Sequence, residues 1–254
     1  MFGWFRRRRR RRVRAEPFPA HWRPILAERV PYFATLQEAL RTKVEGDLMI
    51  FEREKEFVGA GGFEVDEEVR VVISAAAVRL VAELDIAAFD RMREIVVYPA
   101  AYRHPDSDTV VLGEVSQWHT VVLSWEDVLA GLTNPEDGHD TATHEFAHVL
   151  DRASGAFNGT PHLRARADYA PWGQVLSHYF LRLRKNAGKR RTLLRTYAAT
   201  NEAEFFAVAT EMFFERPELL RKRAPDLYEE LGRFYGFSLA DGEVGGEAAN
   251  RGDG

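Results

Sequence analysis

"ATHEFAHVLD", residues 142–151, carries two histidines four positions apart, with a glutamate directly after the first. On an α-helix, residues four apart share a face and lie one turn apart, so both imidazoles can reach one metal ion. The pattern H-E-x-x-H is typical of a zinc-binding helix in which the glutamate acts as general base. It therefore predicts His144 and His148 as zinc ligands and Glu145 as the base. The alternative is a buried helix with ordinary core histidines, because the pattern arises by chance in roughly a few per cent of such chains.

A catalytic zinc ion needs a third protein ligand and an open position for water. The chain has no cysteine, and no further histidine follows at the spacing of longer forms of the motif. A carboxylate from elsewhere is the best remaining choice. The stretch 196–220, "TYAATNEAEFFAVATEMFFERPELL", predicts a helix that is apolar on nearly all sides, and a charge buried there needs a partner such as a metal. Its glutamates are Glu202, Glu204, Glu211 and Glu215.

Helix geometry separates these glutamates. At 100° per residue, Glu202 and Glu204 point about 160° apart, so only one of them can face the zinc. Glu211 shares the face of Glu204 but lies roughly 10 Å further along, where it can support the site without coordinating. Glu202 is nearer the helix start, where the dipole favours a carboxylate without any metal. We therefore expect Glu204 as the third ligand, against a competing role for Glu204 in a capping box with Asn201.

A second acidic residue on the motif helix is Asp151, seven positions after His144. It lies on the same helix face and could accept a hydrogen bond from a ligand histidine. A surface salt bridge with an arginine is an equally good interpretation.

The rest of the chain predicts helices on both sides of a small sheet. Short β-branched runs bounded by turn residues lie at 94–99, 109–115 and 119–125 and are typical of strands. Helical periodicity covers 35–57 and 66–84 before them, and returns after them. Expected helix boundaries are a capping box of Thr35 and Glu38, N-caps at Asp66 and Asp140, and an end at Gly155. The order of helices, strands and helices indicates an α+β fold.

Charge is distributed unevenly. Residues 6–14 hold eight of the 35 basic residues, which leaves 27 against 39 acidic ones, a net charge of about -12 for the rest. Residues 1–20 are therefore expected to form a flexible arginine-rich arm whose removal leaves the fold intact. Residues 21–238 are expected to form one domain, and 239–254 a disordered acidic, Gly-rich tail.

The arm admits sharper interpretations. Its aromatic residues Phe2, Trp4 and Phe5 would help a weak contact with anionic lipid. Nucleic acid is the other polyanion to consider, but an acidic body disfavours a dedicated nucleic-acid binder. No apolar run reaches membrane-spanning length, and no apolar segment of the secretory type follows the arginines. With the absence of cysteine, these features predict a cytoplasmic protein.

Taken together, the motifs resemble the Mlc titration factor A family of bacterial zinc peptidases. The similarity rests on "HEFAHVLD" paired with "YAATNEAEFFAVATEMFFERPELL", and on "GGFEVDEEVRVVISAAAVRLV", "IVVYPAAY" and "VVLSWEDV". It covers roughly residues 25–237. Members are described as cytoplasmic metallopeptidases with aminopeptidase-type activity, and their catalytic core is related to that of anthrax lethal factor. The enterobacterial member also binds and inactivates the repressor Mlc.

The resemblance implies a mainly helical, zincin-type (gluzincin-like) domain with one Zn²⁺ per chain. Carried over by position, it implies that His144, His148 and Glu204 are the zinc ligands and Glu145 is the catalytic base. Tyr197, seven residues before Glu204, matches a tyrosine that steadies the transition state. A phenol can donate a hydrogen bond to a developing oxyanion.

Three function classes follow. The first is a zinc peptidase, aminopeptidase-like, that cleaves peptide or protein substrates with a zinc-activated water. The second is a regulatory protein that binds a Mlc-like transcription repressor on the same scaffold and has little or no catalytic activity. The third is a membrane-surface protein directed by its arginine arm. The arginine arm and the acidic tail have no counterpart in the enterobacterial member, so the repressor partnership carries over less securely than the peptidase chemistry.

Overall fold

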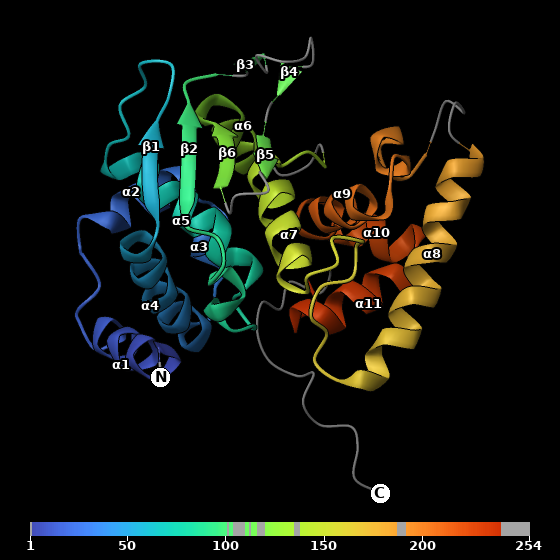
Figure 1. Cartoon of the computed structure of the whole chain (residues 1–254), viewed down its shortest axis with the longest axis horizontal. Coiled ribbons are helices and arrows are strands. Elements are labelled where there is room, and N and C mark those ends of the chain that lie inside the picture. Colours follow the sequence, from blue (N-terminus) through green and yellow to red (C-terminus); the bar gives the residue numbers. More distant parts are fainter. Residues whose placement is uncertain are drawn as a thin grey trace, which may run out of the picture. The chain divides into compact units, whose positions relative to one another are not determined.

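The computed structural model describes residues 2–100, 102–103, 110–111, 113–115, 120–134, 138–186 and 192–239 (Figure 1). The chain forms two compact units, residues 1–133 and 134–254, where the sequence suggested one domain over 21–238. Its described part is mainly helical with a small sheet, in keeping with the predicted α+β class. None of the described helices is long and apolar enough to span a membrane. Residues 240–254 of the predicted tail lie outside the described residues.

The first unit contains a four-stranded sheet in the order β1-β2-β6-β5. Three strands are parallel, namely β1 (Glu56–Gly59), β2 (Glu94–Tyr98) and β6 (Thr120–Ser124). The edge strand β5 (Gly113–Val115) is antiparallel to β6, and β3 (Tyr102–Arg103) pairs with β4 (Val110–Val111) apart from this sheet.

Two predicted strands are confirmed, since β2 and β6 lie within the runs 94–99 and 119–125. The run 109–115 is divided between β4 and β5 rather than forming one strand. Strand β1 was not predicted, because its four residues directly follow a helix and its side chains are mostly exposed. It pairs with β2 as an edge strand. Its sequence lacks the alternation of apolar and polar residues by which a half-buried strand is recognised.

Five helices and a short turn accompany this sheet: α2 (Trp22–Arg29), α3 (Tyr32–Thr35), α4 (Glu38–Glu54), α5 (Glu67–Leu80), α6 (Trp125–Thr133) and η1 (Ile86–Phe89). Helix α5 is the crossover between the parallel strands β1 and β2, which explains why it is buried along most of its length. Asp66 caps it as predicted, because its carboxylate accepts from the Val69 amide at 2.9 Å. The predicted capping box of Thr35 and Glu38 is absent: Thr35 ends α3, and the extended backbone of Leu36 separates the two helices.

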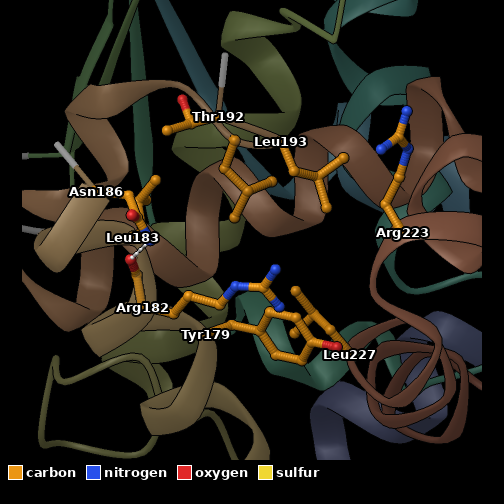
Figure 2. Close-up of a pocket in the computed structure, with 9 residues that line it drawn as sticks. Tyr179, Arg182, Leu183, Asn186, Thr192, Leu193, Arg223 and Leu227 are labelled. Atoms are coloured by element: carbon orange, nitrogen blue, oxygen red, sulfur yellow. Dashed lines mark hydrogen bonds between the residues drawn. The ribbon is translucent and has the colours of Figure 1, made fainter. Parts of the chain in front are cut away.

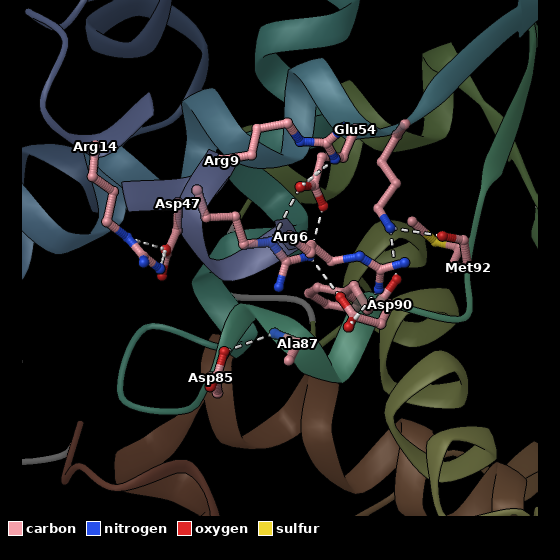
Figure 3. A network of polar contacts seen from close by, with 12 residues as sticks. Arg6, Arg9, Arg14, Asp47, Glu54, Asp85, Ala87, Asp90 and Met92 are labelled. Carbon is pink, nitrogen blue, oxygen red and sulfur yellow. Dashed lines mark hydrogen bonds and ion pairs between the residues drawn. The ribbon is translucent and has the colours of Figure 1, made fainter. Parts of the chain in front are cut away.

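The arginine-rich segment departs most from expectation. Residues predicted to be a flexible arm form the helix α1 (Phe2–Arg14), which packs against α4. Arg10 is only 6% exposed, and its guanidinium lies 2.6 Å from a carboxylate oxygen of both Glu54 and Asp90. Figure 3 shows neighbouring arginines converging on the same carboxylates. Composition could not predict this, because the acidic partners lie 44 and 80 residues away along the chain.

The second unit is helical in its described part. It contains α7 (Thr141–Ala153), α8 (Tyr169–Asn186), α9 (Glu202–Glu215), α10 (Pro217–Arg223) and α11 (Pro225–Tyr235), with short turns η2 (Arg166–Asp168) and η3 (Thr196–Ala199). Helices α7 and α9 lie side by side (Figure 1). Helices α8, α9 and α11 contribute the side chains of an aromatic core, namely Trp172, Phe206, Phe213, Phe234 and Tyr235. The predicted boundaries of α7 are confirmed: Asp140 caps its start, and Gly155 follows its last turn with φ of 92°.

Candidate metal centre

Helix α7 presents both histidines on one buried face. Asp140 fixes its start, since its two carboxylate oxygens accept from the Thr143 amide at 2.9 Å and the Thr143 hydroxyl at 2.7 Å. One turn apart, the rings of His144 and His148 have centroids separated by 4.7 Å, and their Nε2 atoms are 3.1 Å apart. The local spacing of the motif thus brings two imidazole nitrogens to one point.

Glu204 supplies a carboxylate at the same point, from the first turn of α9. Its Oε2 lies 3.1 Å from Nε2 of His144 and 3.5 Å from Nε2 of His148. One ligand atom from each of the three residues lies within 4.8 Å of the other two. Two imidazole nitrogens and one carboxylate oxygen are a donor set that zinc accepts in catalytic sites, with a position left over for water.

The hydrogen bond on the other side of His144 tests whether these residues fit a metal. Its Nδ1 is 2.7 Å from Oε1 of Glu211, so Nδ1 donates to that carboxylate and Nε2 points toward His148 and Glu204. In His148, Nδ1 is buried and has no hydrogen-bond partner among the described residues. The orientation of His144 is therefore fixed for coordination, and the three side chains together fit a zinc ion.

Glu211 links three segments behind the cluster. It is fully buried, and besides His144 it accepts from the Asp140 amide at 3.0 Å and from the guanidinium of Arg195 in a close ion pair. The start of α7, the middle of α9 and the segment before η3 thus share one carboxylate. Both oxygens of this buried carboxylate therefore have hydrogen-bond partners, as a buried polar group requires.

The pKa values show strong coupling within the cluster. Burial lowers the pKa of His144, but hydrogen bonds to Glu204 and Glu211 outweigh it and raise the pKa to about 10. Burial raises the pKa of Glu204, but the two histidines outweigh it and hold the pKa well below the ordinary range. The pKa of His148 is lowered, by burial first and by the charge of His144. Without a metal, the proton of this centre therefore resides on His144.

The predicted base and the predicted tyrosine flank the cluster. Glu145 is 4% exposed, and its charge is among the causes that raise the pKa of His144 and of Tyr197. Tyr197 lies in η3, half exposed, with its ring centroid 6.1 Å from that of His144. Burial, followed by the charge of Glu204, raises the pKa of the phenol to about 12. The hydroxyl thus stays protonated at neutral pH and can donate a hydrogen bond.

The remaining glutamates of α9 lie apart from the cluster. Glu202 is exposed at the helix start, and Glu215 is the last residue of the helix. Asn201 caps α9 as expected, because its side chain accepts from the Glu204 amide at 2.9 Å. The Glu204 carboxylate, however, contacts the histidines. The competing capping role therefore applies to the Glu204 backbone and not to its carboxylate.

Asp151 has a different role from both that were expected. Its carboxylate accepts from the backbone amides of Gly159 at 2.7 Å and Thr160 at 2.9 Å. Within the described part of the chain, its side-chain hydrogen bonds hold the loop after α7, and none goes to a histidine of the cluster or to an arginine. Every residue except proline carries a backbone amide, so the sequence could not indicate which amides would bind Asp151.

Two further residues of the site were missed by sequence reasoning. Arg195 reaches Glu211 from a segment without periodicity. The ring centroid of Phe157 lies 5.2 Å from that of His148, and the Arg152 guanidinium carbon lies 3.9 Å from the Phe157 ring centroid. The Phe157 backbone has φ of 42°, a left-handed conformation that is costly for a bulky residue and is found at functional sites. Neither residue belongs to a motif that could have marked it.

A separate cavity of about 330 Å³ lies elsewhere in the second unit (Figure 2). Its walls come from α8, residues 192–194 and the α10–α11 pair, and include Tyr179, Arg182, Leu183, Leu193, Arg223 and Leu227. None of the cluster's side chains lines it. This cavity is therefore distinct from the cluster of His144, His148 and Glu204.

A family model and several relatives match this chain. The model of a family described as glucose-regulated metallo-peptidase M90 matches residues 4–236. A relative from Synechocystis, described as uncharacterized protein slr2042, is 37% identical over 242 residues, which are 89% of this chain and 87% of the relative. Mlc titration factor A of Cronobacter sakazakii is 30% identical over 233 residues, 86% of each chain. The protein of the same name from Edwardsiella ictaluri is 35% identical over 170 residues, 61% of this chain and 64% of the relative.

Proposed function

The chain belongs to the Mlc titration factor A family of M90 metallopeptidases, and from this premise we propose that it is a zinc-dependent peptidase. The observation that carries the proposal is the convergence of His144, His148 and Glu204 within 4.8 Å. Zincin-type enzymes bind zinc in this way, through an H-E-x-x-H helix and a glutamate further along the chain. We assign the three residues as ligands of one Zn²⁺ per chain.

The proposed chemistry assigns a role to each flanking residue. A bound zinc ion would polarise the scissile carbonyl and lower the pKa of the attacking water. Glu145 takes the proton of that water and passes it to the leaving amine as general base and then acid. The Tyr197 hydroxyl donates a hydrogen bond to the oxyanion of the tetrahedral transition state. Its raised pKa supports this role, because a donor must keep its proton.

We propose peptides as substrates, with an aminopeptidase-like preference for a free N-terminus. Cleavage of a panel of peptides with free and with acetylated N-termini, alongside zinc content by mass spectrometry, tests both statements. Wild-type protein is expected to carry about one zinc per chain and to favour the free N-termini. Protein that binds no zinc even after incubation with excess Zn²⁺ would refute the metallopeptidase assignment.

Four variants separate the proposed roles. Glu204→Ala is expected to lose zinc and hydrolysis together, whereas Glu202→Ala, the exposed neighbour on the same helix, should keep both. Glu145→Gln should keep zinc and lose hydrolysis. Tyr197→Phe should keep zinc and lower kcat on the order of 10²-fold with little change in KM. Loss of zinc in Glu202→Ala with retention in Glu204→Ala would reverse the ligand assignment.

A second candidate function is suggested by the printed name of the relatives, Mlc titration factor A. In this alternative, the chain binds a Mlc-like transcription repressor and its peptidase activity is weak or absent. Glu145→Gln distinguishes the two, because it should preserve repressor binding while abolishing hydrolysis. We propose the cytoplasm as the compartment, which suits a chain without cysteine and with a repressor as partner.

A further inference from the structure

Helix α1 sorts its arginines onto two faces. Arg6, Arg9, Arg10 and Arg14 all form ion pairs with carboxylates of the first unit. Arg7, Arg8, Arg11 and Arg12 are exposed, and none forms an ion pair with a carboxylate in the part of the chain that the structure describes. We call this second set, together with Trp4 and Phe5, the outer face of α1.

The inner face anchors the helix. Arg10 lies between Glu54 and Asp90, Arg6 also pairs with Asp90 at 2.6 Å, and Arg9 pairs with Glu54 at 2.7 Å. Figure 3 shows Arg6 and Arg9 directed at these two carboxylates, with Arg14 directed at Asp47.

The contact with α4 also depends on close packing. A side chain at Gly46 of α4 would begin 2.8 Å from Cγ of Arg14, so a glycine there lets the two helices approach closely. Val13 is buried at the same contact. Ion pairs and packing together hold α1 in one orientation.

The outer face is continuous on the helix. At 100° per residue, Trp4, Arg8 and Arg11 lie within about 60° of one another, and Arg7 and Arg12 flank them. The Arg8 guanidinium lies 5.7 Å from the Trp4 ring centroid, a cation–π contact. Trp4 and Phe5 are 56% and 58% exposed. Four exposed guanidinium groups and two exposed aromatic rings thus share one surface about 12 Å long.

We propose that the outer face of α1 binds the surface of a membrane rich in anionic phospholipids. Arginine guanidinium groups pair with phosphates, and a cluster of four or more basic residues is the recognised scale for anionic lipid binding. Trp4 and Phe5 enter the interface between headgroups and acyl chains, where aromatic side chains are favoured.

Charge favours a membrane over a nucleic acid as the partner. Without the eight arginines of residues 6–14, the chain has a net charge of about -12. An acidic body disfavours a dedicated nucleic-acid binder. The exposed rings of Trp4 and Phe5 favour a bilayer, because its interface between headgroups and acyl chains accepts aromatic side chains.

Anchoring on the inner face also lowers the cost of binding. The helix is already folded, so binding to a membrane does not carry the entropic cost of ordering its thirteen residues. The same design lets the protein attach reversibly, because six side chains make the contact and no helix crosses the bilayer in the described part of the chain.

Vesicle flotation with the full chain tests the proposal. Vesicles of phosphatidylcholine with 30% phosphatidylserine are compared with phosphatidylcholine alone, at about 50 and about 300 mM salt. Binding is expected only to the anionic vesicles and should weaken at the higher salt. Arg7→Gln, Arg8→Gln, Arg11→Gln and Arg12→Gln combined should lower the affinity on the order of 10³-fold while leaving the melting temperature unchanged.

A matched variant controls for net charge. Arg182→Gln, Arg184→Gln, Lys222→Gln and Arg223→Gln combined remove four positive charges from exposed positions of the second unit and should leave vesicle binding unchanged. Quenching by brominated lipid should reach Trp4, and the quenching should disappear in Trp4→Phe although four other tryptophans remain.

Three results would overturn the proposal. One is equal binding to neutral and anionic vesicles. Another is equal loss of binding in the two four-residue variants. The third is tighter binding to RNA or duplex DNA than to anionic vesicles at the same salt, which would identify a nucleic acid as the partner.

Discussion

Glu211 contacts the cluster without being one of the three residues that we propose as zinc ligands. Its carboxylate fixes the Nδ1 proton of His144 and also holds Arg195 and the start of α7. A carboxylate partner makes a ligand imidazole more basic and fixes its ring, and loss of such a partner typically costs 10- to 100-fold in metal affinity.

Glu211→Gln is therefore expected to weaken zinc binding about 10- to 100-fold without abolishing it. Competition with a fluorescent chelator measures the change. Glu202→Gln is the control on the same helix, because Glu202 is exposed and lies outside the cluster. Equal zinc affinity in Glu211→Gln and wild type would show that the hydrogen bond does not tune the metal.

Proton release gives a second test at the same residues. In the metal-free protein the pKa of His144 is raised to about 10, so His144 is protonated at pH 7, whereas the pKa values of His148 and Glu204 are lowered. Zinc needs the neutral imidazole and must displace that proton. Below pH 10, apparent affinity should therefore rise about tenfold per pH unit. Calorimetry at pH 7 in buffers of different ionisation enthalpy should give about one proton released per zinc, and a buffer-independent heat would contradict this.

At the scale of elements, a short loop sets the spacing between α7 and α9. Gly159 donates its amide to Asp151 of α7, while its carbonyl oxygen accepts from the indole of Trp172 at 3.0 Å. Its φ is 74°, and an added Cβ would overlap the backbone oxygen of Glu202 at the start of α9. Only glycine satisfies both conditions. The loop therefore couples the helix of the two histidines to the helix of Glu204.

Gly159→Ala is expected to lower the free energy of unfolding by about 2–5 kcal/mol, as the sum of a left-handed alanine and a backbone overlap. Gly155→Ala is the matched control: φ there is 92°, but nothing lies within 4 Å of the added Cβ. It should cost only about 1–2 kcal/mol. Urea unfolding of both variants measures the difference. Equal costs would mean that the contact with Glu202 relaxes without strain.

For the molecule as a whole, the arginine-rich segment is part of the fold, because its helix α1 pairs with carboxylates of the first unit. An isolated run of arginines repels itself, but the first unit supplies Glu54, Asp90 and Asp47 to one side of it. Burial raises the pKa of Glu54, yet hydrogen bonds from Arg10 and Arg9 outweigh it and lower the pKa below the ordinary 4.5. Deleting residues 1–16 should therefore cost stability, contrary to what composition suggests.

Arg10→Ala is expected to cost about 2–3 kcal/mol of unfolding free energy. This is below the usual cost of breaking a buried pair, because Arg9 and Arg6 still reach the two carboxylates. The lowered pKa of Glu54 means that the ion pair contributes above pH 4.5 and is lost as pH falls through the lowered value, so wild type and variant should converge in acid. Arg8→Ala, on the outer face, should change stability by less than about 0.5 kcal/mol. A similar loss in both variants would show that α1 is not anchored through Arg10.

Local features of this protein were determined by the sequence alone. The spacing of His144 and His148 places their rings together on any α-helix, and the caps at Asp66 and Asp140 bind amides three residues away. Strands β2 and β6 were visible because their β-branched runs are bounded by turns. The caps and the histidine pair each join residues three or four positions apart, so residue type and spacing suffice to predict them. The strands could be predicted from their own residue types, although their pairing is long-range.

Tertiary structure decided the rest, because the partners are far apart in the chain. Helix geometry showed that only one of Glu202 and Glu204 could face the histidines, but the packing of α7 against α9 selected Glu204. The ion pair of Arg195 with Glu211 and the backbone partners of Asp151 depend on loops without periodicity. The arginine helix is ordered by carboxylates more than 30 residues away, and a sequence pattern carries no information about a charge that folding brings into contact.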